Sequence, residues 1–308
     1  MEPHSHAGHS HHHAGGSLKT ALAITAIFLV AEFIGALYTN SLALLADAGH
    51  MLTDVAALSL SLFAIRFAGR RATPRMTYGF HRVEILAALA NGVFLVLVAF
   101  YIFYEAYNRL KSPAVVKANW MLVVALIGLL ANLSSAWVLF GKHHDNLNVR
   151  GAFFHVLTDA IGALGAVLAS IAILVGGYVV ADPLISLMVA VLILWSSWIV
   201  IRDAVDILLE GTPAHINIVN LREQLGHLDG VGSVHDLHVW TLTSGILAMS
   251  CHIVAENESY NGTNLLARVN CVAREDFHID HTTIQIEHNI QQEPLESCNC
   301  HFGAWDSP

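Results

Sequence analysis

Hydrophobic residues in this chain gather into six long, nearly uninterrupted runs. The runs cover residues 18–38, 41–67, 85–109, 117–140, 148–176 and 180–207. Each is long enough for a helix that crosses a hydrocarbon core of about 30 Å, which takes about 20 residues. The pattern therefore predicts an α-helical membrane protein with six transmembrane helices in residues 18–209.

From residue 210 the composition becomes mixed and the hydrophobic period changes. Helical and strand patterns then follow one another as helix 218–228, strands 234–242 and 246–254, helix 261–277 and strand 282–286. The order αββαβ predicts a small α+β domain of ferredoxin-like character in residues 210–290. Residues 291–308 are expected to form an irregular tail that contains cysteines.

The first 17 residues are rich in histidine, and residues 4–13 read HSHAGHSHHH. A purification tag is one alternative, but a tag is normally an unbroken run of histidines. We therefore expect a native, disordered tail that collects metal ions. The segment lacks a basic cluster and leads into a span too long for a signal sequence, so no cleavable signal peptide is expected.

Charge predicts the orientation, because basic residues favour the cytoplasmic side of the membrane. With a cytoplasmic N-terminus, most of the loop cations fall on the inner side, and the outer side receives Arg109, Lys111 and Lys117. Both termini are then cytoplasmic. The net charge of −9 is concentrated after residue 210, which excludes nucleic-acid binding through phosphate neutralisation.

All four cysteines lie in that same cytoplasmic part of the chain, at positions 251, 271, 298 and 300. Disulfide bonds are not expected in a reducing compartment. The thiols are therefore expected to bind metal or to be inert.

Two matched pairs of polar residues interrupt the apolar runs: His50 with Asp54, and His155 with Asp159. Residues four apart share one face of a helix, so each pair offers an imidazole and a carboxylate to the same point. Two such pairs from separate helices supply the four tetrahedral ligands that zinc prefers. Two carboxylates, two neutral imidazoles and Zn²⁺ sum to zero charge, which suits an apolar bundle. The sequence thus predicts an intramembrane zinc site at which protons compete with the metal.

Two other functions are alternatives to transport. An intramembrane metallohydrolase needs an open coordination position and a catalytic base, and the chain has no H-E-x-x-H motif. A membrane-anchored metal sensor needs no carboxylate that faces a pathway. The residues also leave open whether Asp47 caps its helix or orients a ligand, and which of Zn²⁺, Cd²⁺ and Co²⁺ is carried.

Over residues 18–288 the chain resembles the cation diffusion facilitator family, including its bacterial zinc exporters and vertebrate vesicular zinc transporters. The likeness is carried by LADAGHMLTD, TYGFHRVEILAAL, NLNVRGAFFHVLTDAIGALG, ADPLISLMVAVLIL, LLEGTP and VHDLHVWTL. This resemblance implies a homodimer in the bacterial inner membrane that exports zinc in exchange for entering protons. It also implies that His50, Asp54, His155 and Asp159 form the transport site. Members that prefer manganese replace the first histidine, so zinc is favoured here.

Further candidate ligands lie outside the spans. His235 and His252 flank the predicted hairpin, and His281 and Glu287 flank the last strand, so these four side chains are expected at one sheet edge. The family resemblance implies regulatory zinc in this domain and an interfacial metal site that uses His81. It also relates Cys298 and Cys300, in the order C-x-C-H, to a terminal cysteine pair of the vesicular members.

Overall fold

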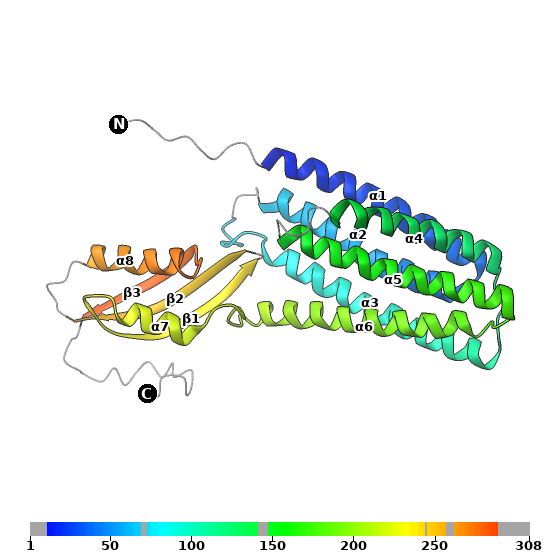
Figure 1. Cartoon of the computed structure of the whole chain (residues 1–308). Coiled ribbons are helices and arrows are strands. Elements are labelled where there is room, and N and C mark those ends of the chain that lie inside the picture. The colour runs from blue at the N-terminus through cyan, green and yellow to red at the C-terminus, as the bar shows by residue number, and fades with distance from the viewer. Residues whose placement is uncertain (1–10, 69–72, 141–146, 244, 257–261, 289–308) are drawn as a thin grey trace. The chain divides into compact units, whose positions relative to one another are not determined.

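A computed structural model describes residues 11–68, 73–140, 147–243, 245–256 and 262–288. Six long helices account for the hydrophobic runs (Figure 1). They are α1 (His11–Thr39), α2 (Leu42–Ala68), α3 (Arg82–Lys111), α4 (Ala118–Phe140), α5 (Leu147–Gly176) and α6 (Ala181–Leu208). All six are long and apolar enough to cross a membrane, which confirms the predicted multi-pass architecture.

The first compact unit comprises residues 1–71 and 86–202 and contains most of the six helices. Two clusters of buried side chains hold it together, and α2 contributes to both. Leu42 and Ala46 pack with α3 and α6, whereas Ala43 and Leu44 pack with α1, α4 and α5. α2 therefore contacts both groups of helices, and the side chains of the first predicted metal pair lie on this shared helix.

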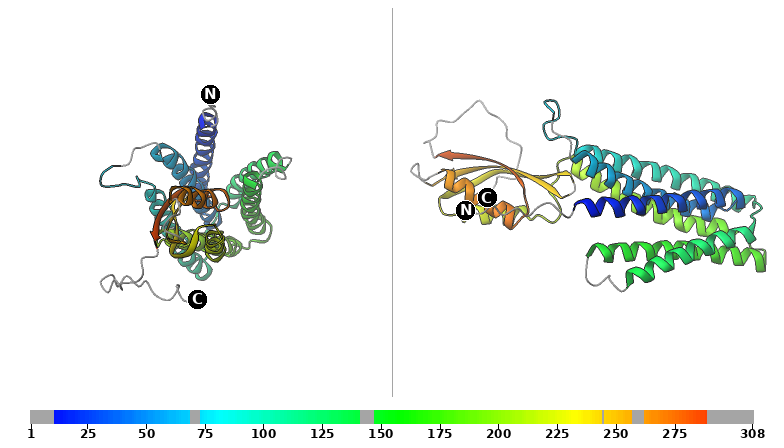
Figure 2. Two further views of the ribbon diagram at one scale, coloured as in Figure 1. Left: turned by 90° about the vertical axis from the view of Figure 1, so that its left-hand side faces the viewer. Right: turned by 90° about the horizontal axis from the view of Figure 1, so that it is seen from above.

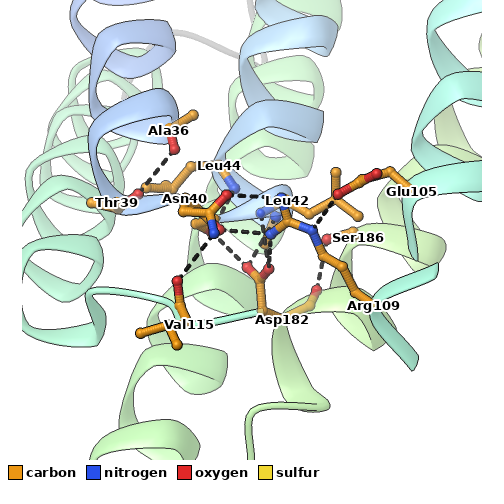
Figure 3. Close-up of polar contacts among 12 residues, drawn as sticks. Ala36, Thr39, Asn40, Leu42, Leu44, Glu105, Arg109, Val115, Asp182 and Ser186 are labelled. Carbon is orange, nitrogen blue, oxygen red and sulfur yellow. Dashed lines mark hydrogen bonds and ion pairs between the residues drawn. The ribbon is translucent and has the colours of Figure 1, made fainter. Parts of the chain in front are cut away.

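Asp182, in the first turn of α6, binds the beginning of α2 (Figure 3). Its side chain is fully buried. Ser41 Oγ donates a 2.6 Å hydrogen bond to its Oδ1, and the backbone N–H groups of Leu42 and Ala43 donate at 2.8 Å and 3.1 Å. The first N–H groups of a helix lack partners within the helix and carry partial positive charge. A carboxylate from another helix thus caps α2.

Arg109, near the end of α3, joins the same cluster. Its Nη1 lies 3.6 Å from Asp182 Oδ2, and its guanidinium donates to the backbone and side-chain oxygens of Asn40 at 2.6 Å and 3.0 Å. Asn40 has a left-handed backbone (φ 56°), a conformation that asparagine tolerates well. We call Asn40, Ser41, Arg109 and Asp182 the Asp182 cluster; it ties together α2, α3, α6 and the α1–α2 turn.

The second compact unit comprises residues 72–85 and 203–308. Its helices and strands follow the predicted order αββαβ as α7 (Ile218–Gly226), β1 (Val231–Thr243), β2 (Ile246–Ala255), α8 (Gly262–Glu275) and β3 (His281–His288). The strand order is β1-β2-β3, with β1 antiparallel and β3 parallel to β2. The parallel pair requires a crossover connection, which α8 supplies.

Both helices of this domain lie on one side of the sheet (Figure 2). Leu221 and Leu225 of α7 and Leu265 of α8 are fully buried, and they pack against a sheet face that includes Met249 and Ile253. The side chain of His252 of β2 lies on the opposite face of the sheet.

Residues 73–85 belong to this second unit and contact the domain within it. Glu84 accepts a 2.8 Å hydrogen bond from Thr243, and Arg82 donates a 2.6 Å hydrogen bond to Glu210. The ring of Tyr78 lies edge-on to that of His281, with 5.5 Å between the ring centroids. His281 is thus placed against Tyr78 at the first residue of β3.

Candidate metal-binding sites

One residue from each intramembrane pair contacts the other across α2 and α5. α2 carries His50 and Asp54 one turn apart, and α5 carries Asp159. The Nε2 atom of His50 lies 3.1 Å from Oδ1 of Asp159, and both side chains are largely buried. His155 belongs to α5 one turn before Asp159, but its side chain lies outside the described residues. The contact that the structure places is therefore between the histidine of one pair and the aspartate of the other.

A cavity of about 370 Å³ lies beside this contact, within the first unit. Asp54 and Asp159 line it, together with Glu32 of α1 and Asp47 of α2. Further polar lining residues are Thr25, Asn132 and Ser135, and the remaining walls are apolar or small. A cavity with several carboxyl groups in an otherwise apolar bundle is a candidate site for cations or protons, because such groups are costly in lipid without partners.

Glu32 is the residue that the sequence analysis missed. It is a carboxylic acid within the first apolar run. An ionisable residue inside a membrane span is by itself a reason to expect a function. Glu32 lies within side-chain hydrogen-bonding reach of Asp47, which is 7% exposed. Gly162 of α5 makes room for Asp47, since a Cβ atom there would lie 3.3 Å from its Oδ1. Asp47 thus faces α1 and α5, and it lies away from the N-terminal turn of α2 that it would need to cap.

A second candidate site lies in the C-terminal domain. His235 of β1, His252 of β2 and Glu287 of β3 each offer a ligand atom, and these atoms all lie within 4.8 Å of one another. His252 Nδ1 lies 3.0 Å from Glu287 Oε1, and His235 Nε2 lies 3.5 Å from Oε2. In the part of the chain that the structure describes, this is the one group of three or more potential ligands so close together.

His281 is not part of that group. In the parallel pairing of β2 with β3, His281 lies opposite Ala248, whereas Gln285 lies opposite His252 and Glu287 opposite Val254. The predicted convergence therefore holds for three of the four side chains. His81 directly precedes α3, in the segment that contacts the domain.

The two cysteines in the described residues differ in burial. Burial raises the pKa of the Cys251 thiol to about 11, which lowers its reactivity at neutral pH. Cys271 is exposed, and its hydrogen bond to Glu275 raises its pKa. Cys298 and Cys300 lie outside the described residues, as do residues 4–10 of the histidine-rich segment, whereas residues 11–13 of that segment form the beginning of α1.

Comparison with known proteins gives matches along nearly the whole chain. Residues 18–209 match the cation efflux transmembrane domain, and residues 213–289 match the cytoplasmic domain of cation efflux proteins. A cadmium, cobalt and zinc/H(+)-K(+) antiporter of Bacillus velezensis is 42% identical over 287 residues, covering 91% of this chain and 92% of the relative. The metal cation efflux system protein CzcD of Cupriavidus metallidurans is 42% identical over 303 residues, covering 97% and 95%.

The zinc transporter ZitB of Escherichia coli is 37% identical over 306 residues and covers 96% of each chain. Among solved structures, the metal-bound C-terminal domain of the C. metallidurans CzcD transporter matches 23% of this chain and 99% of its own length, at 32% identity and a TM-score of 0.23. The two domain matches and the relatives that cover nearly the whole chain all indicate cation efflux proteins. The chain belongs to the cation diffusion facilitator family, a family of cation efflux transporters and not of enzymes.

Proposed function

We propose that this protein exports Zn²⁺ from the cytoplasm in exchange for protons, by alternating access around a site made by His50, Asp54, His155 and Asp159. The observation that carries the proposal is the 3.1 Å contact between His50 and Asp159 beside a carboxyl-lined cavity. It joins ligands from α2 and α5, as a site built from two helical pairs requires. Relatives named as zinc transporters and as cadmium, cobalt and zinc antiporters support the choice of cargo.

The ligand set accounts for selectivity. Imidazole suits zinc and neighbouring transition metals, whereas a site built only of oxygens favours magnesium, calcium or manganese. Zn²⁺ is therefore the expected substrate, and Cd²⁺ and Co²⁺ are further candidates because they accept the same mixed nitrogen and oxygen ligands. A loaded site of two histidines and two aspartates is electrically neutral, which lowers the cost of exposing it to either side of the membrane.

Proton coupling follows from the same ligands. Imidazole and carboxylate groups bind a metal only when they are deprotonated, so zinc and protons compete for one set of atoms. Rocking of one group of helices against another would expose the site to each side in turn. α2 is suited to transmit such motion because it packs against α3 and α6 on one part of its surface and against α1, α4 and α5 on another.

The protein is expected to act as a homodimer in the inner membrane of a bacterium, with both termini in the cytoplasm. We also propose that the C-terminal domain binds regulatory zinc through His235, His252 and Glu287. Two imidazoles and one carboxylate within 4.8 Å fit the ligand preference of zinc. His81 and Cys298 with Cys300 stay predicted contributors to further metal sites.

Flux into sealed vesicles tests the proposal. Purified protein is reconstituted into liposomes that contain a zinc indicator, with the interior made acidic relative to the outside. Zinc uptake should accelerate with the gradient and fall when an ionophore collapses it. The matched control is the Asp54→Asn, Asp159→Asn double variant, which should show background uptake.

Three other outcomes contradict parts of the proposal. Uptake that is indifferent to the gradient means a facilitated pathway without antiport. Wild-type uptake by the double variant removes the site assignment. Folded protein that binds zinc but moves none favours the alternative of a membrane-anchored metal sensor.

A further inference from the structure

The pairing of β1 with β2 is irregular between His235 and His238. His235 pairs with His252, but the next aligned pair is His238 with Ser250, so Asp236 and Leu237 together lie opposite Cys251. Two residues facing one is the definition of a β-bulge. Asp236 takes a left-handed backbone conformation (φ 50°), which costs little for aspartate compared with most other residues.

The bulge decides which way the side chains face. A regular strand alternates, so His235 would share a face with Leu237 and Val239. Those two residues are buried in the core, at 7% and 2% exposure, whereas the side chain of His235 is 42% exposed. The extra residue shifts the alternation, and His235, Asp236 and His238 all reach the solvent-facing side that carries His252.

Imidazoles and carboxylates then alternate in one continuous series. His238 Nε2 lies 2.9 Å from Asp236 Oδ1, and Asp236 Oδ2 lies 3.8 Å from His252 Nε2. The other ring nitrogen of His252, Nδ1, lies 3.0 Å from Glu287 Oε1. The two nitrogens of His252 therefore face two different carboxylates, of which only Glu287 belongs to the group of three potential ligands.

A histidine that binds a metal uses one ring nitrogen and donates the N–H of the other, commonly to a carboxylate. That carboxylate fixes which nitrogen carries the proton, holds the ring in place and makes the ligating nitrogen a stronger donor to the metal. We propose that Asp236 is this positioning residue: when the metal binds, its carboxylate closes the present 3.8 Å separation and accepts the Nε2–H of His252, so that Nδ1 is left to bind the metal beside Glu287 and His235. This inference rests on the proposed zinc site of the C-terminal domain.

The roles of the two carboxylates differ for a geometric reason. Glu287 lies near both histidines of the group, at 3.0 Å from His252 and 3.5 Å from His235. Asp236 lies on the far side of the His252 ring, where it contacts Nε2, and His238 donates to its other oxygen. Glu287 is therefore placed as a ligand and Asp236 as the support of a ligand.

The test measures Co²⁺ and Zn²⁺ binding to the full chain in detergent, with Co²⁺ absorption as the report on coordination. The background carries Asp54→Asn and Asp159→Asn, lacks residues 1–13 and has Cys298→Ser and Cys300→Ser, so that other candidate sites do not contribute. The metal binding that is lost in the His252→Ala variant is assigned to the site in the C-terminal domain. If His252→Ala removes no binding, the proposed domain site itself fails.

Three variants distinguish the effect of losing the carboxylate from the effect of disturbing the backbone conformation: Asp236→Asn, Asp236→Gly and Asp236→Ala. Asparagine and glycine both tolerate the left-handed conformation, and alanine does not. Loss of a supporting carboxylate typically weakens metal affinity by about 10–100-fold. We expect a loss of that size in all three variants, with an unchanged type of Co²⁺ spectrum. The matched control is Asp280→Asn, which removes an exposed carboxylate of the same domain and should leave affinity unchanged.

Three results would overturn the positioning role. Affinity within twofold of the background in Asp236→Asn would show that the carboxylate is not needed. Loss in Asp236→Ala alone would show that only the bulge geometry matters. A Co²⁺ spectrum of a different coordination number in Asp236→Asn would make Asp236 a ligand.

Discussion

His50 on α2 and Asp159 on α5 are 109 residues apart in the chain, and their side chains meet at 3.1 Å. Each belongs to a different predicted pair, so the histidine of the first pair faces the aspartate of the second. An aspartate that contacts an imidazole from another helix is available to bridge the two helices through a shared metal. Substitution of either aspartate therefore tests whether the two helices share one metal site.

Replacing Asp159 or Asp54 with alanine should reduce zinc flux to background while the protein still inserts and folds. Removing one carboxylate leaves the loaded site with net positive charge in an apolar environment, at a cost of several kcal/mol. Uptake into liposomes measures the flux, and size-exclusion chromatography in detergent checks the fold. Asp280→Ala is the matched control, since Asp280 is exposed in the other unit. Flux near the wild-type rate in either variant would refute its role as a ligand.

Changing His50 to aspartate should shift selectivity from zinc toward manganese or cadmium. Imidazole favours zinc, whereas a third carboxylate favours harder or larger cations and adds one negative charge. Competition between metals in the flux assay measures the preference. An unchanged preference for Zn²⁺ would mean that His50 does not discriminate between metals.

Deleting residues 4–13 should weaken zinc capture at low concentration and leave maximal flux nearly intact. A histidine-rich segment outside the membrane acts by raising the local concentration of metal ions. Flux measured across a range of zinc concentrations should show a higher half-saturation value with a similar plateau. Complete loss at saturating zinc would instead assign the segment an essential role.

Replacing Asp182 with alanine should destabilise the protein by about 3–5 kcal/mol, the range for breaking a buried charged contact. Asp182→Asn should cost less, because the amide oxygen still accepts a hydrogen bond from the start of α2. Thermal unfolding in detergent measures both. The control is Glu105→Gln, which removes the partly exposed ion pair to Arg109 and should cost no more than about 1 kcal/mol. Equal shifts in all three variants would mean that burial of Asp182 adds nothing.

Cys271 should react slowly with alkylating reagents at pH 7.5, because Glu275 raises its pKa and the thiolate is the reactive form. Glu275→Gln should lower that pKa and speed the reaction, and the difference should vanish at a pH well above the pKa. Rates are measured by mass spectrometry in a variant with Cys298→Ser and Cys300→Ser. Buried Cys251 serves as the internal control, since it should stay unmodified until the protein unfolds. Equal rates in the two proteins would remove the role of Glu275.

The helices and the order of the domain were predictable because both depend on local periodicity. Six apolar runs and one αββαβ pattern appear in the structure with ends shifted by a few residues. A spacing of four places His50 and Asp54 on one face of α2, and this much follows from the sequence alone. The cross-pair contact of His50 with Asp159 depends on how α2 and α5 pack, and no local pattern encodes that.

Other features needed three-dimensional information. Glu32 and Asp47 come close because α1 packs on α2, and His281 leaves the predicted group because of the register between β2 and β3. The three cations predicted for the outer side each contact a neighbouring side chain. Arg109 belongs to the Asp182 cluster, and Lys111 and Lys117 lie over the rings of Tyr107 and Tyr38.

The Asp182 cluster also sets an order of assembly. Ser41 and Asp182 are separated by 141 residues, which take about 7–28 s to synthesise at about 5–20 residues per second. Throughout that interval the beginning of the second helix has been made, and the carboxylate that completes its hydrogen bonds has not. A chain that stops short of the sixth helix therefore lacks the carboxylate that accepts the first N–H groups of its second helix.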